Sequence, residues 1–223
     1  MNWLGKSIEN SKRLRTHYKM GEIDIYIKDS LPEDIDADSV FKYISNRIPS
    51  HLMTSVDIIY IGDFDMFKER EINALFQDGA IYVSNNQDDF DDMVDDIVHE
   101  ISHSNEKRYF NLLYDDQSLK KEFLAKRNTL YRSLLSHGYK PYTKVGNTYL
   151  YDEQIDMSFY KEVGYETILH MTMGLFPSPY AATSLREYFA VGFENYYLKD
   201  RALLKKECPV LYKKLSELEF PED

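Results

Sequence analysis

The spacing of hydrophobic positions changes along the chain, from strand-like before residue 88 to helical after it. Residues 23–27 alternate between isoleucine and more polar side chains, which predicts a half-buried strand. Residues 56–61 are nearly all apolar and mostly β-branched or aromatic, which predicts a strand buried on both faces. A third strand is predicted over residues 79–84, between two pairs of turn-forming residues, and a helix over residues 38–47. The first part of the chain is therefore expected to form a small sheet accompanied by a helix.

Helical periodicity dominates the rest of the chain. The predicted helices cover residues 88–107, 119–136, 160–173, 184–198 and 203–218. No repeat, low-complexity tract or Gly/Ser-rich linker separates the two parts, so one domain over residues 1–223 is expected. Strands followed by helices predict the α+β class, with an N-terminal α/β lobe over about residues 1–110 and a helical lobe over about residues 111–223.

The composition is that of a folded, acidic protein. The 223 residues include 27 Lys and Arg against 38 Asp and Glu, which gives a net charge of −11, and 43% of the residues are hydrophobic. This excess of negative charge disfavours nucleic acid as a partner, because neutralising phosphates requires a basic face. The single cysteine, Cys208, cannot form an internal disulfide, which favours a reducing compartment. The sequence has neither an apolar h-region at its N-terminus nor a membrane-spanning stretch, so a cytoplasmic protein without a membrane partner is expected.

Residues 99–103 read His-Glu-Ile-Ser-His, the HExxH pattern of zinc sites, within the helix predicted over residues 88–107. The apolar side chains of this helix fall on one stripe: Phe90, Met93, Val94, Ile97, Val98 and Ile101. His99 and His103 lie on the opposite face, one turn apart, where two imidazoles can reach one tetrahedral ion. Glu100 is rotated by about 100° from His99, so it flanks the ion without ligating it and can act as a general base.

Six aspartates crowd residues 88–96, at the start of the same predicted helix. Acidic side chains suit the N-terminus of a helix and favour solubility, which is the simpler interpretation. The alternative is that Asp92, Asp95 and Asp96, which share the face of His99, make the site negative and favour basic peptides.

A catalytic zinc site requires a third protein ligand besides the two histidines, and three glutamates compete for this role. Glu106 lies one turn after His103 on the same face, but three consecutive ligands on one straight helix would place the ion awkwardly. Glu122 lies 19 residues after His103, in a segment that resembles an exposed helix. Glu187 opens a later predicted helix and points away from its apolar stripe, but with Ser184 it also forms a capping-box pattern. The pattern alone leaves these alternatives open.

Residues 179–194, taken together with the HExxH pattern, resemble the zinc metallopeptidases of the anthrax lethal factor type. The resemblance implies one zinc ion per chain, held by His99, His103 and Glu187. It also implies that the hydroxyl of Tyr180, seven residues before Glu187, hydrogen-bonds toward the oxygen at the metal. The implied fold is zincin-like: a small twisted mixed sheet with an edge strand over the HExxH helix, followed by a helical C-terminal lobe.

The resemblance extends to a substrate site on the predicted sheet. The strand over residues 79–84 is similar to the edge strand that these folds offer to peptide substrates. Ile81, Tyr82 and Val83 are therefore expected to bind an extended peptide in antiparallel orientation.

The expected function is that of a zinc-dependent endopeptidase of the HExxH-plus-Glu (gluzincin) kind, acting on a protein or peptide substrate. It would hydrolyse peptide bonds by a metal-activated water, with Glu100 as general base and Tyr180 stabilising the developing oxyanion. The alternative is a non-catalytic, zincin-like binding or regulatory protein that holds a structural zinc.

Overall fold

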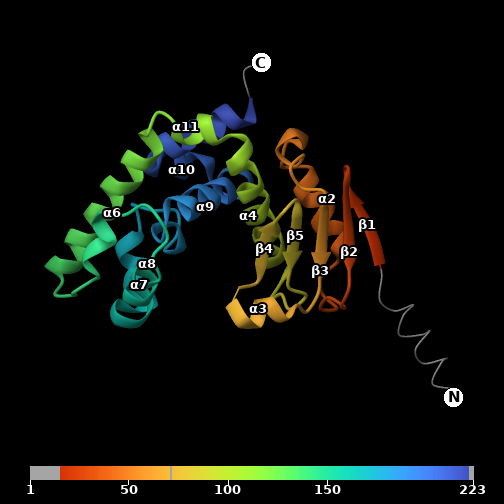
Figure 1. Cartoon of the computed structure of the whole chain (residues 1–223), viewed down its shortest axis with the longest axis horizontal. Helices are drawn as coiled ribbons and strands as arrows, with labels where there is room; N and C mark the ends of the chain where they lie inside the picture. The colour runs from red at the N-terminus through yellow and green to blue at the C-terminus, as the bar shows by residue number, and fades with distance from the viewer. Residues whose placement is uncertain (1–15, 71, 221–223) are drawn as a thin grey trace. The chain divides into compact units, whose positions relative to one another are not determined.

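The computed structural model describes residues 16–70 and 72–220 (Figure 1). The chain divides into two compact units, the first ending at Arg108 and the second beginning at Tyr109. Within the described residues no helix is long and apolar enough to cross a membrane. The N-terminal residues on which the expected lack of a secretory signal depends lie outside the described part of the chain.

The first unit contains a five-stranded mixed sheet. Its strands are β1 (Thr16–Met20), β2 (Ile23–Ile27), β3 (Ile58–Ile61), β4 (Ala74–Gln77) and β5 (Ala80–Val83). They lie in the order β1-β2-β3-β5-β4, with β4 on the left and β1 on the right of the sheet in Figure 1. The three inner strands run parallel, and each outer strand pairs antiparallel with its neighbour. The sheet and the helices after it confirm the α+β class expected from the sequence.

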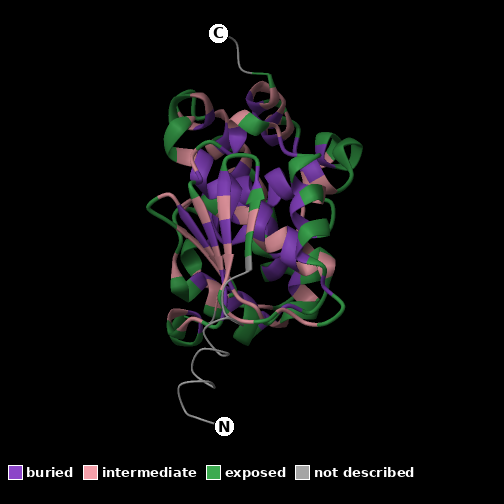
Figure 2. Ribbon diagram, turned by 90° about the vertical axis from the view of Figure 1, so that its right-hand side faces the viewer, coloured by how far each residue is buried: buried purple, intermediate pink, exposed green. Residues whose placement is uncertain are grey.

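One face of the sheet packs on helices. Ile25, Ile59 and Ile81 lie in register on neighbouring strands and are fully buried, and buried and less buried residues alternate along the strands (Figure 2). Helix α2 (Ala37–Ser45) contacts β1, helix α4 (Phe90–Arg108) contacts β4 and β5, and the two helices contact each other. Burial of this apolar face fixes α4 against the sheet.

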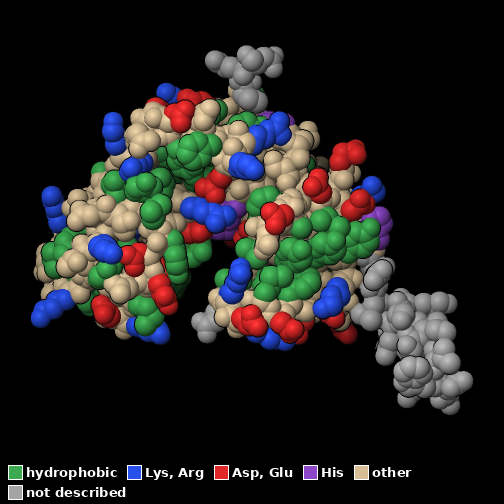
Figure 3. All heavy atoms as spheres, viewed as in Figure 1, with side chains coloured by type: hydrophobic (Ala, Val, Ile, Leu, Met, Phe, Trp, Pro, Cys, Tyr) green, Lys and Arg blue, Asp and Glu red, His purple; other side chains and the backbone are tan. Residues whose placement is uncertain are grey.

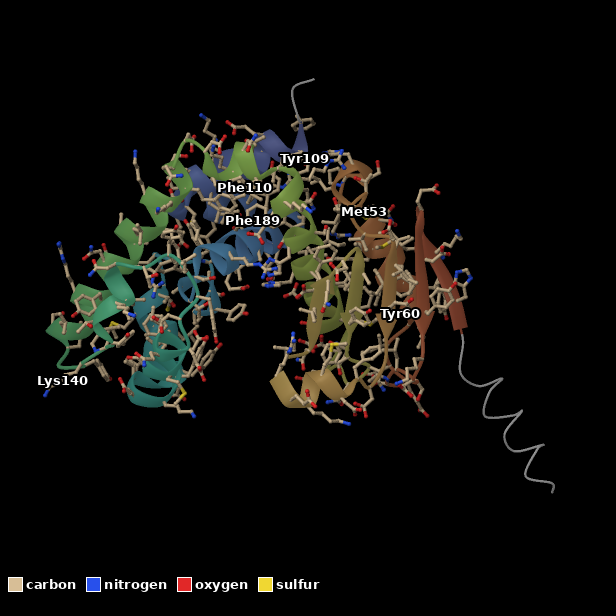
Figure 4. The ribbon with its side chains drawn as sticks, viewed as in Figure 1. Met53, Tyr60, Tyr109, Phe110, Lys140 and Phe189 are labelled. Atoms are coloured by element: carbon tan, nitrogen blue, oxygen red, sulfur yellow. The ribbon has the colours of Figure 1, made fainter. Side chains whose placement is uncertain are left out.

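The opposite face of the sheet carries a row of aromatic side chains. His17, Tyr26, Tyr60 and Tyr82 are paired across β1, β2, β3 and β5, with successive ring centroids 4.9, 6.0 and 5.4 Å apart. Figure 3 shows hydrophobic side chains gathered over these strands, and Tyr60 is labelled on β3 in Figure 4. Such cross-strand aromatic pairs stabilise a sheet and fix its register.

The second unit is helical. Its helices are α5 (Phe110–Tyr114), α6 (Ser118–Ser136), α7 (Glu153–Met157), α8 (Tyr165–Thr172), α9 (Leu185–Leu198), α10 (Arg201–Glu207) and α11 (Pro209–Glu219). Helix α9 lies at the centre of the core, because Tyr188, Phe189 and Phe193 are fully buried on it (Phe189 is labelled in Figure 4). A methyl group added to Gly192 would meet the side chain of Leu211, so α9 and α11 pack closely at this glycine and a larger residue would displace Leu211.

Two of the predicted helices are interrupted. The helix predicted over residues 160–173 forms a π-helical segment (Ser158–Gly164) followed by α8, and Gly164 adopts a positive φ of 90° at the junction. The helix predicted over residues 203–218 is two helices, because Cys208 leaves the helical conformation and Pro209 begins α11. Proline lacks a backbone N–H and is accommodated in the first turn of a helix but not in its interior.

The prediction that residues 79–84 form an edge strand is wrong, because the neighbouring strand β4 lies at the edge of the sheet. Ile81, Tyr82 and Val83 belong to β5, which pairs with β3 on one side and β4 on the other, so its backbone groups are already used within the sheet. Among the described residues the edge strand against the HExxH helix is β4. The two strands form a hairpin at Asp78 and Gly79, which adopt positive φ values of 51° and 83°. Asp-Gly is a strong two-residue hairpin signal, and the turn that the sequence predicts before residues 79–84 therefore joins two paired strands.

Candidate functional site

Helix α4 holds both histidines of the HExxH pattern in a geometry that suits one metal ion. The Nε2 atoms of His99 and His103 lie 3.1 Å apart, and the two rings are nearly perpendicular. Two nitrogens that each lie 2.0–2.1 Å from one tetrahedral zinc ion are about 3.3 Å apart. The imidazole pair therefore matches two corners of a zinc tetrahedron.

The core anchors this helix on the side away from the histidines. Met93, Val94, Ile97, Val98 and Ile101 are at most 2% exposed, as the predicted stripe requires. Phe90, the first residue of the stripe, is only half-buried. Burial of the stripe from Met93 to Ile101 prevents the helix from rotating, so the direction in which the imidazoles project is fixed.

The buried surface of α4 continues past the stripe into polar residues. Ser102 and Ser104 turn their hydroxyls back onto the carbonyls of His99 and Ile101, at 2.6 and 2.7 Å. Asn105 donates from its side-chain nitrogen to the carbonyl of Leu52, at 2.7 Å. These bonds satisfy the hydroxyl groups of Ser102 and Ser104 and the side-chain nitrogen of Asn105, which would otherwise be costly to bury.

Glu106 contacts the outer nitrogen of His103. Its Oε2 lies 3.3 Å from Nδ1, whereas Nε2 of the same ring faces His99. The two nitrogens of an imidazole point away from each other, so a carboxylate held at Nδ1 does not reach an ion held at Nε2. Of the three glutamates that compete to be the third ligand, Glu106 therefore contacts the nitrogen of His103 that points away from His99.

Glu100 is held by the edge strand of the sheet. Its side chain is buried, and its Oε2 accepts a hydrogen bond of 2.6 Å from the backbone N–H of Phe76 in β4. Phe76 directs this N–H away from β5, because it is opposite Ile81 in a pair of the antiparallel ladder that exchanges no hydrogen bonds. Among the described residues this is the one hydrogen bond of the Glu100 carboxylate, so one of its oxygens is fixed in position.

Asp96 is one turn before Glu100 on α4. Burial raises the pKa of Asp96 from its ordinary value of 3.8 to about 7, against the opposing effect of a hydrogen bond from the side-chain amide of Gln87. The negative charges of Asp92 and Glu100 raise it further, and His99 lowers it. This aspartate therefore departs from the interpretation of the acidic run as a solvated helix terminus.

Glu187 lies in the first turn of α9, in the second unit. Ser184 is the N-cap, and its hydroxyl oxygen accepts a hydrogen bond of 3.2 Å from the backbone N–H of Glu187. This is one half of the capping box that the sequence predicts. The capping role of Ser184 fixes the helix start, and with it the position from which the Glu187 side chain projects.

A buried arginine secures the segment before α9. Arg127 of α6 is fully buried and donates from Nη1 to the carbonyls of Thr148 and Thr183, at 3.1 and 3.3 Å. The backbone N–H of Leu185 also bonds the carbonyl of Tyr149, at 2.8 Å. The start of α9 is thus held from two sides. No motif identifies Arg127, because its partners are backbone carbonyls distant in sequence.

Tyr180 and Asp156 are two further side chains with ionisable groups in the second unit, which contains Glu187. Tyr180 begins a short 3-10 helix (Tyr180–Ala182) and is 46% exposed, so its ring is not a packed core aromatic. Burial raises the pKa of Asp156, the charge of Glu187 acts in the same direction, and Tyr151 and Arg127 oppose it. Asp156 is therefore an electrostatic neighbour of Glu187 that sequence reasoning did not single out.

Glu122 has a structural role. Its Oε1 accepts from the hydroxyl of Tyr188 and the N–H of Leu211, at 2.8 and 3.1 Å, and its Oε2 accepts from the N–H of Val210, at 2.9 Å. A carboxylate placed on the first N–H groups of a helix stabilises that helix. Glu122 thus caps α11 inside the second unit, and the expectation of an exposed segment around it does not hold for this residue.

No protein-family model, no curated protein sequence and no solved structure matches this chain. The resemblance to metallopeptidases of the lethal factor type therefore stays a prediction from the sequence.

Proposed function

We propose that this protein is a zinc-dependent endopeptidase in which His99, His103 and Glu187 hold the metal. The observation that carries the proposal is the 3.1 Å separation of the two Nε2 atoms on α4, close to the nitrogen separation in a tetrahedral zinc site. The adjacent Glu100 has the residue type, burial and fixed orientation of a general base.

Two observations support Glu187 as the third ligand. Within the described residues, His99, His103 and Glu187 are a group of the kind that can hold a metal ion, each offering one ligand atom. The two competing glutamates have other partners, since Glu106 contacts the outer nitrogen of His103 and Glu122 caps α11. Two imidazoles and one carboxylate are a donor set of catalytic zinc sites, which leave a further position for water or substrate.

The residues of the site divide the chemistry between them. A bound zinc ion would polarise both a water molecule and the carbonyl of the scissile peptide bond. Glu100 accepts the proton that the attacking water loses, on the oxygen not used by Phe76, and delivers it to the leaving amine. The Tyr180 hydroxyl donates a hydrogen bond to the developing oxyanion, a contribution of about 2–4 kcal/mol for donors of this kind.

The substrate would be an extended peptide that pairs with β4 rather than with β5. In the described sheet β4 has a neighbour on one side only, and the backbone groups of Ala74 and the carbonyl of Phe76 point away from β5, while the N–H of Phe76 is already taken by Glu100. The Phe76 N–H is bonded to Glu100, so the general base is adjacent to the strand that would bind the substrate.

Zinc content and peptide hydrolysis test the proposal together. The wild-type protein is expected to bind one zinc ion per chain and to cleave members of a peptide library, with cleavage abolished by a chelator and restored by zinc. Glu187→Gln should lose most of the zinc. Glu166→Gln, which changes an exposed acid in the first turn of α8, should lose none and is the matched control.

Each alternative result has a distinct meaning. One zinc ion in both variants would remove Glu187 from the ligand set, and no zinc in the wild-type protein after reconstitution would refute the metal site. Zinc binding without cleavage of any peptide would support the alternative of a non-catalytic protein with a structural zinc.

A further inference from the structure

The two nitrogens of the His103 ring have different neighbours. Nδ1 faces Oε2 of Glu106 at 3.3 Å, and Nε2 faces Nε2 of His99 at 3.1 Å. Glu106 follows His103 by three residues on the same helix, so the two side chains are neighbours on one face of α4. The contact is also shielded from water, since the His103 and Glu106 side chains are only 5% and 18% exposed.

The chemistry of the pair determines where the ring proton lies. A neutral imidazole has one N–H and one lone pair, while an ionised carboxylate has only acceptors. The contact between Glu106 and Nδ1 therefore requires the proton on Nδ1 and leaves the lone pair on Nε2, toward His99. A metal ion needs that lone pair, because only an unprotonated nitrogen can be a ligand.

We propose that Glu106 is a positioning residue, which holds His103 in the Nδ1–H tautomer and so prepares Nε2 to bind the metal. This inference rests on the proposed function for the identity of the ligand, but it concerns a residue that the proposed mechanism does not use. It also gives Glu106 a role different from the direct ligation that its spacing suggested.

A second histidine–carboxylate pair in the chain supplies the matched control. His17 and Asp24 contact each other at 2.8 Å across β1 and β2, but their side chains are 44% and 38% exposed. In that pair the carboxylate of Asp24 contacts Nε2 of His17, whereas in the α4 pair the carboxylate of Glu106 contacts Nδ1 of His103. Removing the charge of Asp24 therefore changes a histidine–carboxylate contact without affecting the α4 site.

Two measurements test the role of Glu106. The first is zinc affinity, measured by competition with a chromophoric chelator for the wild type, Glu106→Gln and Asp24→Asn. Loss of an outer carboxylate that orients a histidine ligand weakens zinc binding by about 10- to 100-fold. We expect that loss for Glu106→Gln, and unchanged affinity for Asp24→Asn.

The second measurement is the tautomer of His103 in the metal-free protein, determined by ¹⁵N nuclear magnetic resonance at a pH well above the ordinary histidine pKa of about 6.5. The wild type should carry its proton on Nδ1. In Glu106→Gln a mixture of tautomers is expected, because an amide can accept from or donate to the ring.

The outcomes separate this inference from the proposed function. Equal zinc affinities for the wild type and Glu106→Gln, or a proton on Nε2 in the wild type, would overturn the role of Glu106. A wild-type protein that binds no zinc would refute the metal site, and the tautomer would still decide whether Glu106 orients His103. Circular dichroism of both variants excludes misfolding as the cause of any change.

Discussion

Helices α4 and α6 are both 19 residues long, but some of their polar side chains have different kinds of partner. On α6, Glu122 accepts bonds from backbone N–H groups of α11, and Arg127 donates to backbone carbonyls in two other segments. On α4, Glu100, Ser102, Ser104 and Asn105 also bond backbone groups, but two further polar side chains, His99 and His103, face each other. Polar side chains that bond backbone groups fix the path of the chain, whereas two imidazoles that face each other on one helix have the spacing of two ligands of one ion.

The largest expected effect is on catalysis, from a substitution on α4. Glu100→Gln keeps an oxygen that can accept the Phe76 N–H but removes the charged group that takes up a proton. Peptide hydrolysis is expected to fall by about 10²- to 10⁴-fold, the usual contribution of a general base, while zinc content stays at the wild-type level. Initial rates on a cleaved peptide, with zinc measured in the same samples, check both parts.

The control for this substitution is Asp91→Asn, which changes an exposed acid in the first turn of the same helix. Its cleavage rate should match that of the wild type. A Glu100→Gln protein that cleaves at a rate near the wild type would mean that Glu100 is held by Phe76 for structural reasons only, as Glu122 is held on α6.

The second prediction concerns stability, from a substitution on α6. Glu122→Ala would leave the N–H groups of Val210 and Leu211 and the hydroxyl of Tyr188 without their acceptor. An unsatisfied buried donor costs about 1–3 kcal/mol, and partial rearrangement reduces the sum. The free energy of unfolding is expected to fall by about 2–4 kcal/mol, as measured by urea denaturation.

Zinc content per folded chain should be unchanged in Glu122→Ala, because the carboxylate is fully engaged within the second unit. Glu166→Ala, at an exposed position of α8, should cost little stability. If Glu122→Ala stays folded but loses its zinc, Glu122 would be a metal ligand after all. The difference between the two helices would then disappear.

The sequence could predict the elements whose pattern is local. The stripe from Met93 to Ile101 repeats without interruption, and the HExxH spacing fixes where the histidines lie relative to it, so helix and motif both followed from the residues. Strand β5 was also predicted, because Gly79 precedes a short apolar run. Strand β4 was missed, since its sequence Ala-Leu-Phe-Gln is short and its pairing with β5 depends on the turn at Asp78.

The roles of the glutamates could not be predicted because they depend on contacts between distant residues. Glu122 and its partner Val210 are 88 positions apart, and no periodicity relates them. Glu106 is close to His103 in sequence, but which ring nitrogen it contacts depends on the side-chain torsions of both residues. Local pattern therefore identified the candidates, and only the tertiary structure assigns them different partners.

The smallest expected effect is an increase in stability when an acidic side chain is removed, the opposite of the effect expected for Glu122→Ala. An acid on α6 stabilises the fold, whereas Asp96 on α4 should destabilise it near neutral pH, because its pKa is raised by burial to about 7. Below about pH 4 the carboxyl is protonated in both the folded and the unfolded state and has no effect. Between about pH 4 and pH 7 the folded state binds more protons than the unfolded state, so stability falls as the pH rises.

Asp96→Asn removes this dependence while retaining an oxygen that can accept the hydrogen bond from Gln87. Each pKa unit corresponds to about 1.4 kcal/mol, so the full shift would amount to about 4 kcal/mol, and partial exposure of Asp96 should reduce the gain to about 2 kcal/mol. Urea denaturation of the metal-free wild type and variant should therefore give equal stabilities near pH 4 and a more stable variant at pH 8. Asp91→Asn should show no such divergence, since Asp91 is exposed on the same helix. If the free energies of unfolding of Asp96→Asn and the wild type differ by the same amount at every pH in this range, Asp96 is ionised in the folded protein, as expected for a solvated helix terminus.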